Sequence, residues 1–219
     1  PLSSLLFVFC SSPCGALLLL PLRRRRAGHW GLVDPPDGRR KHKSKPGPLV
    51  GGIGVLSATL VGLFLAATLG VSTAEELAAD PRLMALFGAV LVLAVIGLID
   101  DSKGLRGRHK LLGQLFAIGL LLTVGEIRVQ KIELFGGEVD LGPFGQIFAL
   151  LWLLGCVNAI NLIDGMDGLL GSVGALICVT VAVVSIVSGQ WPVALVAVAL
   201  GGGLVGCLRY NLPPASVYL

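Results

Sequence analysis

Residues 82–101 read RLMALFGAVLVLAVIGLIDD, an apolar run that ends in two adjacent carboxylates. No ionisable residue lies between Leu83 and Ile99. Crossing the hydrocarbon core of a bilayer takes about 20 apolar residues in a helix. A strand of a membrane barrel would instead alternate apolar and polar residues, which this stretch does not do. The stretch therefore predicts a transmembrane helix with Asp100 and Asp101 at its end.

The same pattern recurs along the whole chain of 219 residues, which is 54% hydrophobic, only 14% charged and has a mean hydropathy of +0.87. Soluble domains usually carry about 25% charged residues. We therefore predict an all-α fold, a polytopic helical membrane bundle that forms a single domain over residues 1–219. The expected spans are seven apolar blocks, at 2–22, 48–71, 82–99, 110–125, 141–160, 169–188 and 191–208.

The basic residues give the predicted orientation. Seven spans place 14 of the 17 Lys and Arg on the side of segments 23–47, 100–110, 161–168 and 209–219. Positively charged loops mark the cytoplasmic face of a membrane protein. We therefore expect a multi-pass protein of the inner (plasma) membrane, with the N-terminus outside. On the opposite side, segment 126–140 alternates loosely around a Gly-Gly pair, which is typical of a small β-hairpin.

The first predicted cytoplasmic loop contains GLVDPPDGRRKHKSKPGPLVGG, residues 31–52. A cluster that only orients the chain, or that binds anionic lipid, would explain its many cations. It would not explain the prolines after Asp34 or the histidine at position 42. A shaped basic loop suits a phosphate-bearing substrate, so Arg40, Lys41 and His42 are predicted to bind substrate.

Asp100 and Asp101 open the second loop. The simpler interpretation is a helix end in water, paired with Lys103 or Arg106, but one carboxylate would suffice for that. Ionisable residues at membrane depth are costly and usually functional. Two adjacent acids repel each other unless a cation lies nearby, which favours a divalent metal or a basic clamp.

The third loop contains NAINLIDGMDGL, residues 158–169. Residues three apart lie near one face of a helix, so Asn158, Asn161, Asp164 and Asp167 would form a polar stripe, broken where the glycines end the helix. Hydrogen bonding between helices would explain the amides. It would not require two anions, which together with amides suit Mg²⁺ or a sugar phosphate.

Acids, cations and a divalent metal together fit phosphoryl transfer, in which the metal and the cations balance phosphate charge. The membrane setting favours a lipid phosphate as one substrate. We expect Mg²⁺ as the cofactor, with Mn²⁺ as the alternative. A homodimer is the expected assembly, and no nucleic acid partner is expected.

NAINLIDGMDGL, LIDDSKGL followed by KLLGQ, and VDPPDGRRKH followed by Gly-Gly resemble the polyprenyl-phosphate N-acetylhexosamine-1-phosphate transferases, the glycosyltransferase family 4 enzymes. Among these the chain looks most like the bacterial undecaprenyl-phosphate GlcNAc-1-phosphate transferases of cell-envelope polysaccharide synthesis. The resemblance implies transfer of GlcNAc-1-phosphate from a UDP-N-acetylaminosugar to a polyprenyl phosphate, with release of UMP. The alternative is a phospho-MurNAc-pentapeptide transferase, a group that usually has Thr where this chain has Ile163.

The resemblance also implies roles for individual residues. Asp100 and Asp101 match the paired acids, one of which would activate or position the lipid phosphate, and Lys110 matches a phosphate-binding cation. Asn161, Asp164 and Asp167 match the nucleotide-sugar and metal region. The metal ligands that we expect are Asp100, Asp101 and Asp164; the catalytic set adds Asp167; and the substrate-binding set is Arg40, Lys41, His42, Lys110, Asn158, Asn161 and Asn211.

In the family, the region around Asn211 is followed by a Gly-Asp-x-Gly sequence and a later His-rich loop. This chain ends at Leu219, before both. We therefore expect a C-terminally truncated transferase. An inactive or ion-coupled membrane protein is the remaining alternative, for the case in which the chain is complete.

Overall fold

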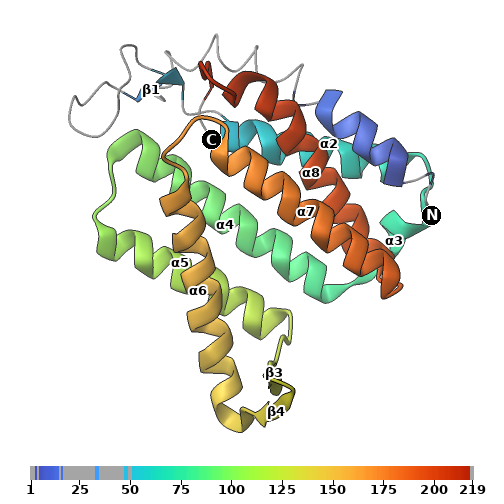
Figure 1. The fold of residues 1–219 in the computed structure, drawn as a ribbon, viewed down its shortest axis with the longest axis vertical. Coiled ribbons are helices and arrows are strands. Elements are labelled where there is room, and N and C mark those ends of the chain that lie inside the picture. The colour runs from blue at the N-terminus through green and yellow to red at the C-terminus, as the bar shows by residue number, and fades with distance from the viewer. Residues whose placement is uncertain are drawn as a thin grey trace. The chain divides into compact units, whose positions relative to one another are not determined.

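The structure is a computed structural model that describes residues 3, 5–14, 16, 33–34, 47–48 and 51–217. Figure 1 labels the helices and strands. The chain divides into two compact units. Unit 1 comprises Pro1–Ala79 and Ile163–Leu219, and unit 2 comprises Asp80–Leu162. The single domain predicted for residues 1–219 stays a prediction.

Unit 1 is built around its last helix. Its elements are a helical segment at Leu5–Cys14, a two-stranded pairing of β1 (Val33–Asp34) with β2 (Gly47–Pro48), and the helices α2 (Gly51–Thr68), α3 (Ser72–Ala79), α7 (Leu169–Val187) and α8 (Trp191–Asn211). α8 packs against α7, α2 and α3. The core between these helices is made of small and medium side chains: Ala16, Val55, Ala58, Cys178, Leu204, Cys207 and Val217.

Glycines on α8 allow the close approach of its neighbours. A Cβ at Gly203 would lie 3.2 Å from the carbonyl oxygen of Val55 on α2. A Cβ at Gly206 would lie 2.9 Å from the backbone of Pro13. Small residues have this role in membrane bundles because backbones can then pack directly against each other.

Unit 2 contains three helices and a hairpin: α4 (Pro81–Lys103), α5 (Gly107–Val124), β3 (Lys131–Leu134), β4 (Gly137–Asp140), the short η2 (Gly142–Phe144) and α6 (Gly145–Ile163). α5 lies between the other two helices. Ala117 and Leu121 pack with Ala85 and Ala89 of α4, and the next residues along, Ile118 and Leu122, pack with Ala149 of α6.

Both ends of α4 follow from local sequence. Asp80 is its N-cap and accepts a hydrogen bond from the backbone N–H of Arg82 at 2.8 Å, while Pro81 occupies the first turn, where its missing N–H costs nothing. Gly104 follows the last residue with φ +66°, a left-handed conformation that favours glycine. The helix thus continues past the apolar run and includes both Asp100 and Asp101.

The helical membrane bundle is confirmed. Five helices of the described residues are long and apolar enough to cross a membrane: Gly51–Thr68, Pro81–Lys103, Gly142–Ile163, Leu169–Val187 and Trp191–Asn211. They correspond to five of the seven predicted blocks. α5 is not among them because it begins with Gly107, Arg108, His109 and Lys110, and the described part of the first block is the shorter apolar helix Leu5–Cys14. The count of seven therefore stays a prediction.

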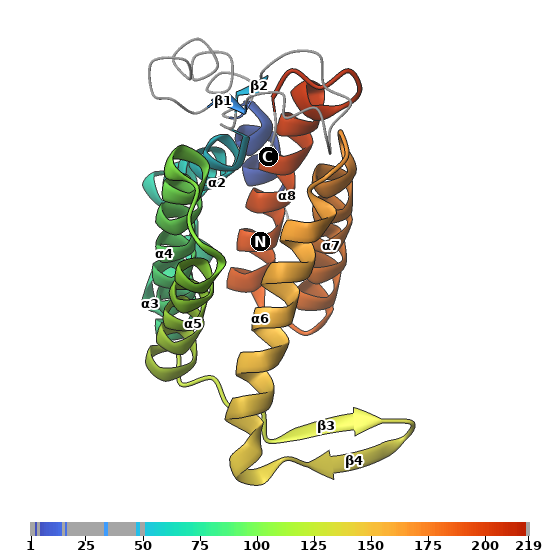
Figure 2. The ribbon, with the colours of Figure 1, turned by 90° about the vertical axis from the view of Figure 1, so that its left-hand side faces the viewer.

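The hairpin expected within residues 126–140 is present. β3 and β4 pair antiparallel, with Lys131 opposite Asp140 and Leu134 opposite Gly137. Figure 2 shows the hairpin leaving the N-terminal end of α6 crosswise to the axis of that helix.

Candidate functional site

The turn between α4 and α5 is held by Asp100. The backbone N–H of Gly104 donates to the Asp100 carbonyl at 2.8 Å, and the N–H of Leu105 donates to Asp100 Oδ1 at 3.0 Å. The side chain of Asp100 therefore closes the α4 end and fixes the path of the chain into α5.

The other oxygen of Asp100 forms an ion pair. Lys110 Nζ lies 2.7 Å from Asp100 Oδ2, and the two side chains are 31% and 22% exposed. The pair neutralises a carboxylate at a helix end. The sequence offered Lys103 or Arg106 as the partner of the two acids, whereas in the structure the partner of Asp100 is Lys110. Because both oxygens of Asp100 make local bonds, its most direct role is to position this turn. Its contact with substrate or metal stays a prediction.

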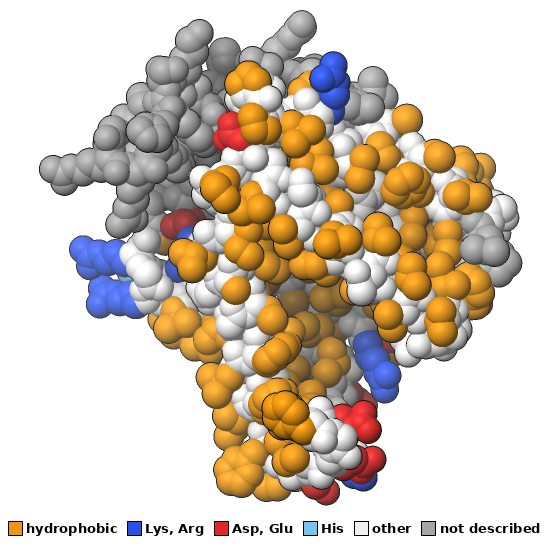
Figure 3. Space-filling model, viewed as in Figure 1, with side chains coloured by type: hydrophobic (Ala, Val, Ile, Leu, Met, Phe, Trp, Pro, Cys, Tyr) orange, Lys and Arg blue, Asp and Glu red, His pale blue; other side chains and the backbone are white. Residues whose placement is uncertain are grey.

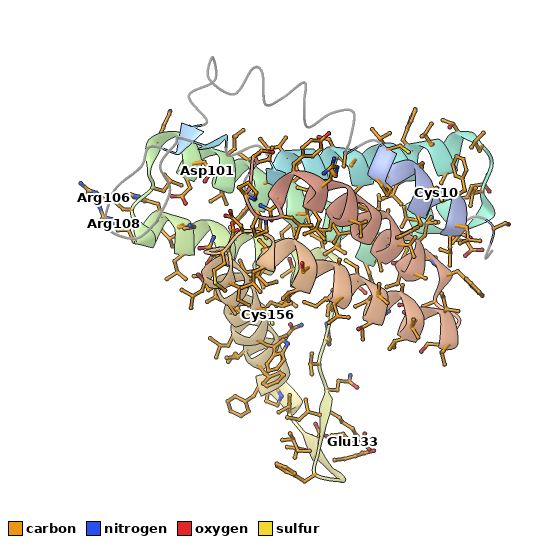
Figure 4. The ribbon with its side chains drawn as sticks, turned by 45° about the horizontal axis from the view of Figure 1, so that its top comes forward. Cys10, Asp101, Arg106, Arg108, Glu133 and Cys156 are labelled. Carbon is orange, nitrogen blue, oxygen red and sulfur yellow. The ribbon has the colours of Figure 1, made fainter. Side chains whose placement is uncertain are left out.

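Asp101 differs from its neighbour. Successive residues of a helix point about 100° apart, so the two carboxylates leave α4 in different directions. Asp101 is exposed, as are Arg106 and Arg108 in the following turn. Figure 4 shows the two arginine side chains extending outward from this turn. An exposed carboxylate and two exposed guanidinium groups at the same helix–turn–helix junction are residue types that bind metal ions and phosphates.

Gln114 extends the polar face of α5 and was not among the predicted site residues. It lies one turn after Lys110, is only 5% exposed, and accepts a 2.9 Å hydrogen bond at Oε1 from Asn158 Nδ2 on α6. Asn158 Nδ2 also donates to the carbonyl of Leu154 at 2.8 Å. The spacing of four residues from Lys110 was the available signal, because residues four apart share a helix face.

This pairing gives Asn158 a structural role. An amide pair between two helices is the interhelical hydrogen bond that the sequence also allowed. Asn161 lies one turn further along α6 and is exposed. Substrate binding by Asn158 or Asn161 stays a prediction.

The polar stripe of residues 158–167 is only partly helical. α6 ends at Ile163, residues 164–168 form turns, and α7 begins at Leu169 after Gly168, which has φ +78°. Asp164 and Asp167 are therefore on a turn. Asp164 is exposed and Asp167 is half-buried.

The segment after α8 holds this turn in place within unit 1. Asp167 Oδ2 accepts a 3.1 Å hydrogen bond from the N–H of Ala215. Asn211 Oδ1 accepts from the N–H of Gly168 at 3.0 Å, and Asn211 Nδ2 donates to the carbonyl of Val217 at 2.9 Å. Asn211 is 4% exposed. Its amide is thus used to position the turn, and direct substrate contact by Asn211 stays a prediction.

The acidic residues fit a magnesium ion by type. Mg²⁺ prefers carboxylate oxygens and often combines one or two of them with substrate phosphates and waters. Within the described residues, no group of three His, Cys, Asp or Glu side chains is arranged to hold a metal. Magnesium dependence stays a prediction.

Two parts of the predicted site are not described. Arg40, Lys41 and His42 lie outside the described residues. The prediction that the acidic loops and the basic loop share one pocket also stays a prediction, since Asp100 and Asp101 belong to unit 2 and Asp164 and Asp167 to unit 1.

Comparison with known proteins identifies relatives of the chain. It is 33% identical to the phospho-N-acetylmuramoyl-pentapeptide-transferase of Streptococcus pneumoniae (strain Hungary19A-6) over 189 residues, which cover 82% of this chain and 56% of the relative. It is 32% identical to the enzyme of the same name from Moorella thermoacetica over 221 residues, covering 94% and 65%. It is 33% identical to the enzyme of the same name from Enterococcus faecalis (strain ATCC 700802 / V583) over 205 residues, which cover 86% of this chain and 61% of the relative.

These relatives are longer than this chain, which spans 56–65% of their length. A family-level match covers the acidic loops, the hairpin and the segment after α8. Residues 83–219 match the family described as Glycosyl transferase family 4. The chain therefore belongs to glycosyl transferase family 4.

Proposed function

We propose that the protein transfers a phospho-N-acetylmuramoyl-pentapeptide group from its UDP carrier to a polyprenyl phosphate and releases UMP. The observation that carries the proposal is the 32–33% identity to transferases of this name over 82–94% of the chain. The site supports it, because both acidic turns lie at helix ends, where a water-soluble nucleotide can meet a membrane lipid.

The second candidate is transfer of GlcNAc-1-phosphate, which the sequence favoured because Ile163 replaces a threonine. That argument rests on one side chain at the last residue of α6. The relatives are 32–33% identical to this chain over 189–221 residues, and this similarity outweighs a difference at one position. The two candidates differ in the sugar and share the donor type, the acceptor and the leaving group.

The reaction needs little covalent chemistry from the protein. An oxygen of the lipid phosphate attacks the β-phosphorus of the UDP-sugar, a new P–O bond forms, the bond between the two phosphates breaks, and UMP leaves. Catalysis of this kind consists mainly of positioning and charge balance. Bound Mg²⁺ would neutralise the phosphate oxygens.

We assign the residues accordingly. Asp101, Asp164 and Asp167 are the carboxylates that would hold Mg²⁺, and one of the acids would act as a base that takes a proton from the attacking lipid phosphate. Lys110 supplies a cation close to the turn, and Asp100 holds Lys110 and the turn in place. Asn211 holds the Asp167 turn through Gly168.

An ion-coupled transporter fits the described residues less well. Transporter sites lie near the bilayer midplane, commonly in broken helices. Here Asp100 and Asp101 are in the last turn of α4, and Asp164 and Asp167 follow the end of α6. None of the four acids lies in the middle of a span.

The direct test is turnover by purified protein expressed from its complete coding sequence. UMP release would be measured with undecaprenyl phosphate, Mg²⁺, and either UDP-MurNAc-pentapeptide or UDP-GlcNAc. We expect turnover with the first donor. Turnover only with UDP-GlcNAc would establish the second candidate, and no turnover with either would refute both.

The site assignment is tested by Asp101→Asn and Asp164→Asn, with Glu133→Gln on the hairpin as a matched control. Each site variant removes one charge without changing size, and we expect turnover to fall about 100-fold or more. Normal turnover in both variants, with unchanged size-exclusion profiles, would contradict the assignment.

We further propose that the α4–α5 turn faces the cytoplasm and the hairpin faces outward across the inner membrane. The support is the excess of Lys and Arg on the side of the acidic loops. To test this, Arg108→Cys and Glu133→Cys would each be made with the exposed Cys10, Cys14 and Cys156 changed to Ser, and labelled in intact cells with a membrane-impermeant maleimide. We expect only position 133 to react, and reaction at position 108 alone would reverse the orientation.

A further inference from the structure

The β3–β4 hairpin has two chemically different faces. Its loop is the two-residue pair Phe135-Gly136, and both residues have positive φ, 51° and 80°. This is the backbone of the tight turns that match the twist of paired strands. The loop and the pairing of Leu134 with Gly137 therefore fix which residues share a face.

Residues directly opposite each other in an antiparallel pair point to the same side. Lys131 pairs with Asp140 and Glu133 with Glu138, so one face carries four charged side chains. Ile132 pairs with Val139, and Leu134 lies two residues along from Ile132, so the other face is entirely apolar. The charged face also contains an ion pair, with Lys131 Nζ 2.7 Å from Glu138 Oε2.

The apolar face is uncovered within the described part of the chain. Leu134 is 50% exposed, Val139 is 44% exposed, and Phe135 at the tip is fully exposed. A ribbon of two strands has no second layer on which to bury such a face and is marginal in water by itself. An apolar face of this kind therefore needs a partner.

The position of the hairpin points to lipid as that partner. It connects the end of α5 at Val124 to the start of α6, and only 6% of the apolar window of α6 is buried. Phe144 at the end of η2, and Ile147 and Leu151 on the first two turns of α6, are 55–70% exposed. Figure 3 shows apolar side chains continuing along α6 down to the charged cluster at the hairpin. The apolar surface of the hairpin thus continues an apolar surface of α6 that is exposed within the described residues.

The direction in which the hairpin leaves α6 also supports lipid as the partner. A ribbon that leaves a membrane helix crosswise at its end runs along the plane of the membrane surface (Figure 2). Aromatic and apolar side chains favour this interfacial region when charged groups on the other side stay in water.

We propose that residues 131–140 form an interfacial anchor, in which Phe135 and the face of Ile132, Leu134 and Val139 insert among the lipids of the adjoining leaflet. The charged face stays in water. Three acids and one lysine make that face net negative, which disfavours anionic headgroups nearby, so the partner that we propose is a zwitterionic lipid surface. The anchor depends on the membrane fold alone and not on the proposed reaction.

The test uses an environment-sensitive fluorophore (NBD) on single cysteines in the full-length protein, reconstituted in phosphatidylcholine vesicles. Positions 134, 135 and 139 report the apolar face, and positions 133 and 138 are the matched controls. The exposed Cys10, Cys14 and Cys156 would be changed to Ser, while Cys178 and Cys207 are buried and stay. Quenching by doxyl-labelled lipid and by aqueous iodide would be compared.

We expect lipid quenching at 134, 135 and 139 at least threefold stronger than at 133 and 138, with the opposite order for iodide. Equal iodide quenching at all five positions would overturn the proposal, because the face would then lie in water. Protection of the apolar face from both quenchers would also overturn it and would indicate a protein partner. If a labelled variant fails to fold, the Phe135→Trp variant replaces it. Quenching of its tryptophan fluorescence by brominated lipid, after subtraction of the wild-type signal, then distinguishes the same outcomes.

Discussion

Helices α8 and α6 are similar in length and apolar character, yet they lie in different surroundings. Half of the apolar window of α8 is buried inside the protein, whereas 6% of that of α6 is buried. α8 carries Gly201, Gly202, Gly203 and Gly206 and is packed by three other helices. α6 presents large side chains outward, and among these Trp152 is 63% exposed.

The difference shows that apolar character alone does not identify the centre of a membrane bundle. Lipid tails are as apolar as leucine, so burial against protein is decided by how closely backbones can approach. Small residues therefore mark α8, the helix around which unit 1 packs, and large apolar side chains mark α6, which is little buried within the described residues.

Gly206→Leu should give the largest loss of stability. A Cβ added at this position would lie only 2.9 Å from the backbone of Pro13, so a leucine side chain would force α8 away from the helical segment Leu5–Cys14. We expect a loss of about 3 kcal/mol in the free energy of unfolding. Gly155→Leu on α6 is the matched control, because nothing lies within 4 Å of a Cβ there. Thermal unfolding in detergent, followed by size exclusion, measures both variants, and equal losses would refute the comparison.

Asn211→Ala should have the next largest effect. It leaves the buried N–H of Gly168 and the carbonyl of Val217 without their hydrogen bonds, which costs about 2 kcal/mol. Turnover should fall as well, because the Asp167 turn loses its support. Asn211→Asp retains the acceptor for Gly168 and should recover part of the turnover. If the alanine variant kept full stability, the positioning role of Asn211 would be wrong.

Lys110→Met tests the corresponding turn of unit 2. Its ion pair with Asp100 is partly exposed, so the loss of stability should be below about 1 kcal/mol. The proposed role near phosphate predicts a large fall in turnover from the same change. Size exclusion and UMP release measured on one preparation separate the two effects. A large loss of stability would mean that the ion pair is structural.

Lys131→Met on the hairpin should have the smallest effect. Both members of the Lys131–Glu138 pair are more than half exposed, and such pairs contribute at most about 0.5 kcal/mol. We expect unchanged unfolding and unchanged turnover. A measurable fall in either would show that the charged face of the hairpin contacts another part of an assembly.

Much of the helical pattern could be predicted because apolar runs mark helices in lipid. The predicted helix ends were less accurate, because the apolar run and the helical hydrogen bonding end at different residues. The block predicted to end at 99 continues as α4 to Lys103, because Asp100 and Asp101 still fit a helix and Gly104 ends it. α3 was missed because it has only eight residues, too few for an apolar period to stand out.

The site was predictable only at the level of residue types. The Asp100–Lys110 pair follows from two helix ends joined by a short turn. The contacts of Asn211 with Gly168 and of Ala215 with Asp167 join residues 43 and 48 positions apart. No local pattern specifies such contacts, because they depend on how α7 and α8 return the chain to the same end of unit 1.

The hydrogen bond from Ala215 to Asp167 has a consequence for the synthesis of the protein on the ribosome. Chains are synthesised at about 5–20 residues per second, so the carboxylate leaves the ribosome roughly 2–10 s before its donor. Helices α7 and α8 are synthesised during that interval. The hydrogen bond therefore forms late in synthesis, and a nascent chain halted before residue 215 would contain Asp167 without this bond.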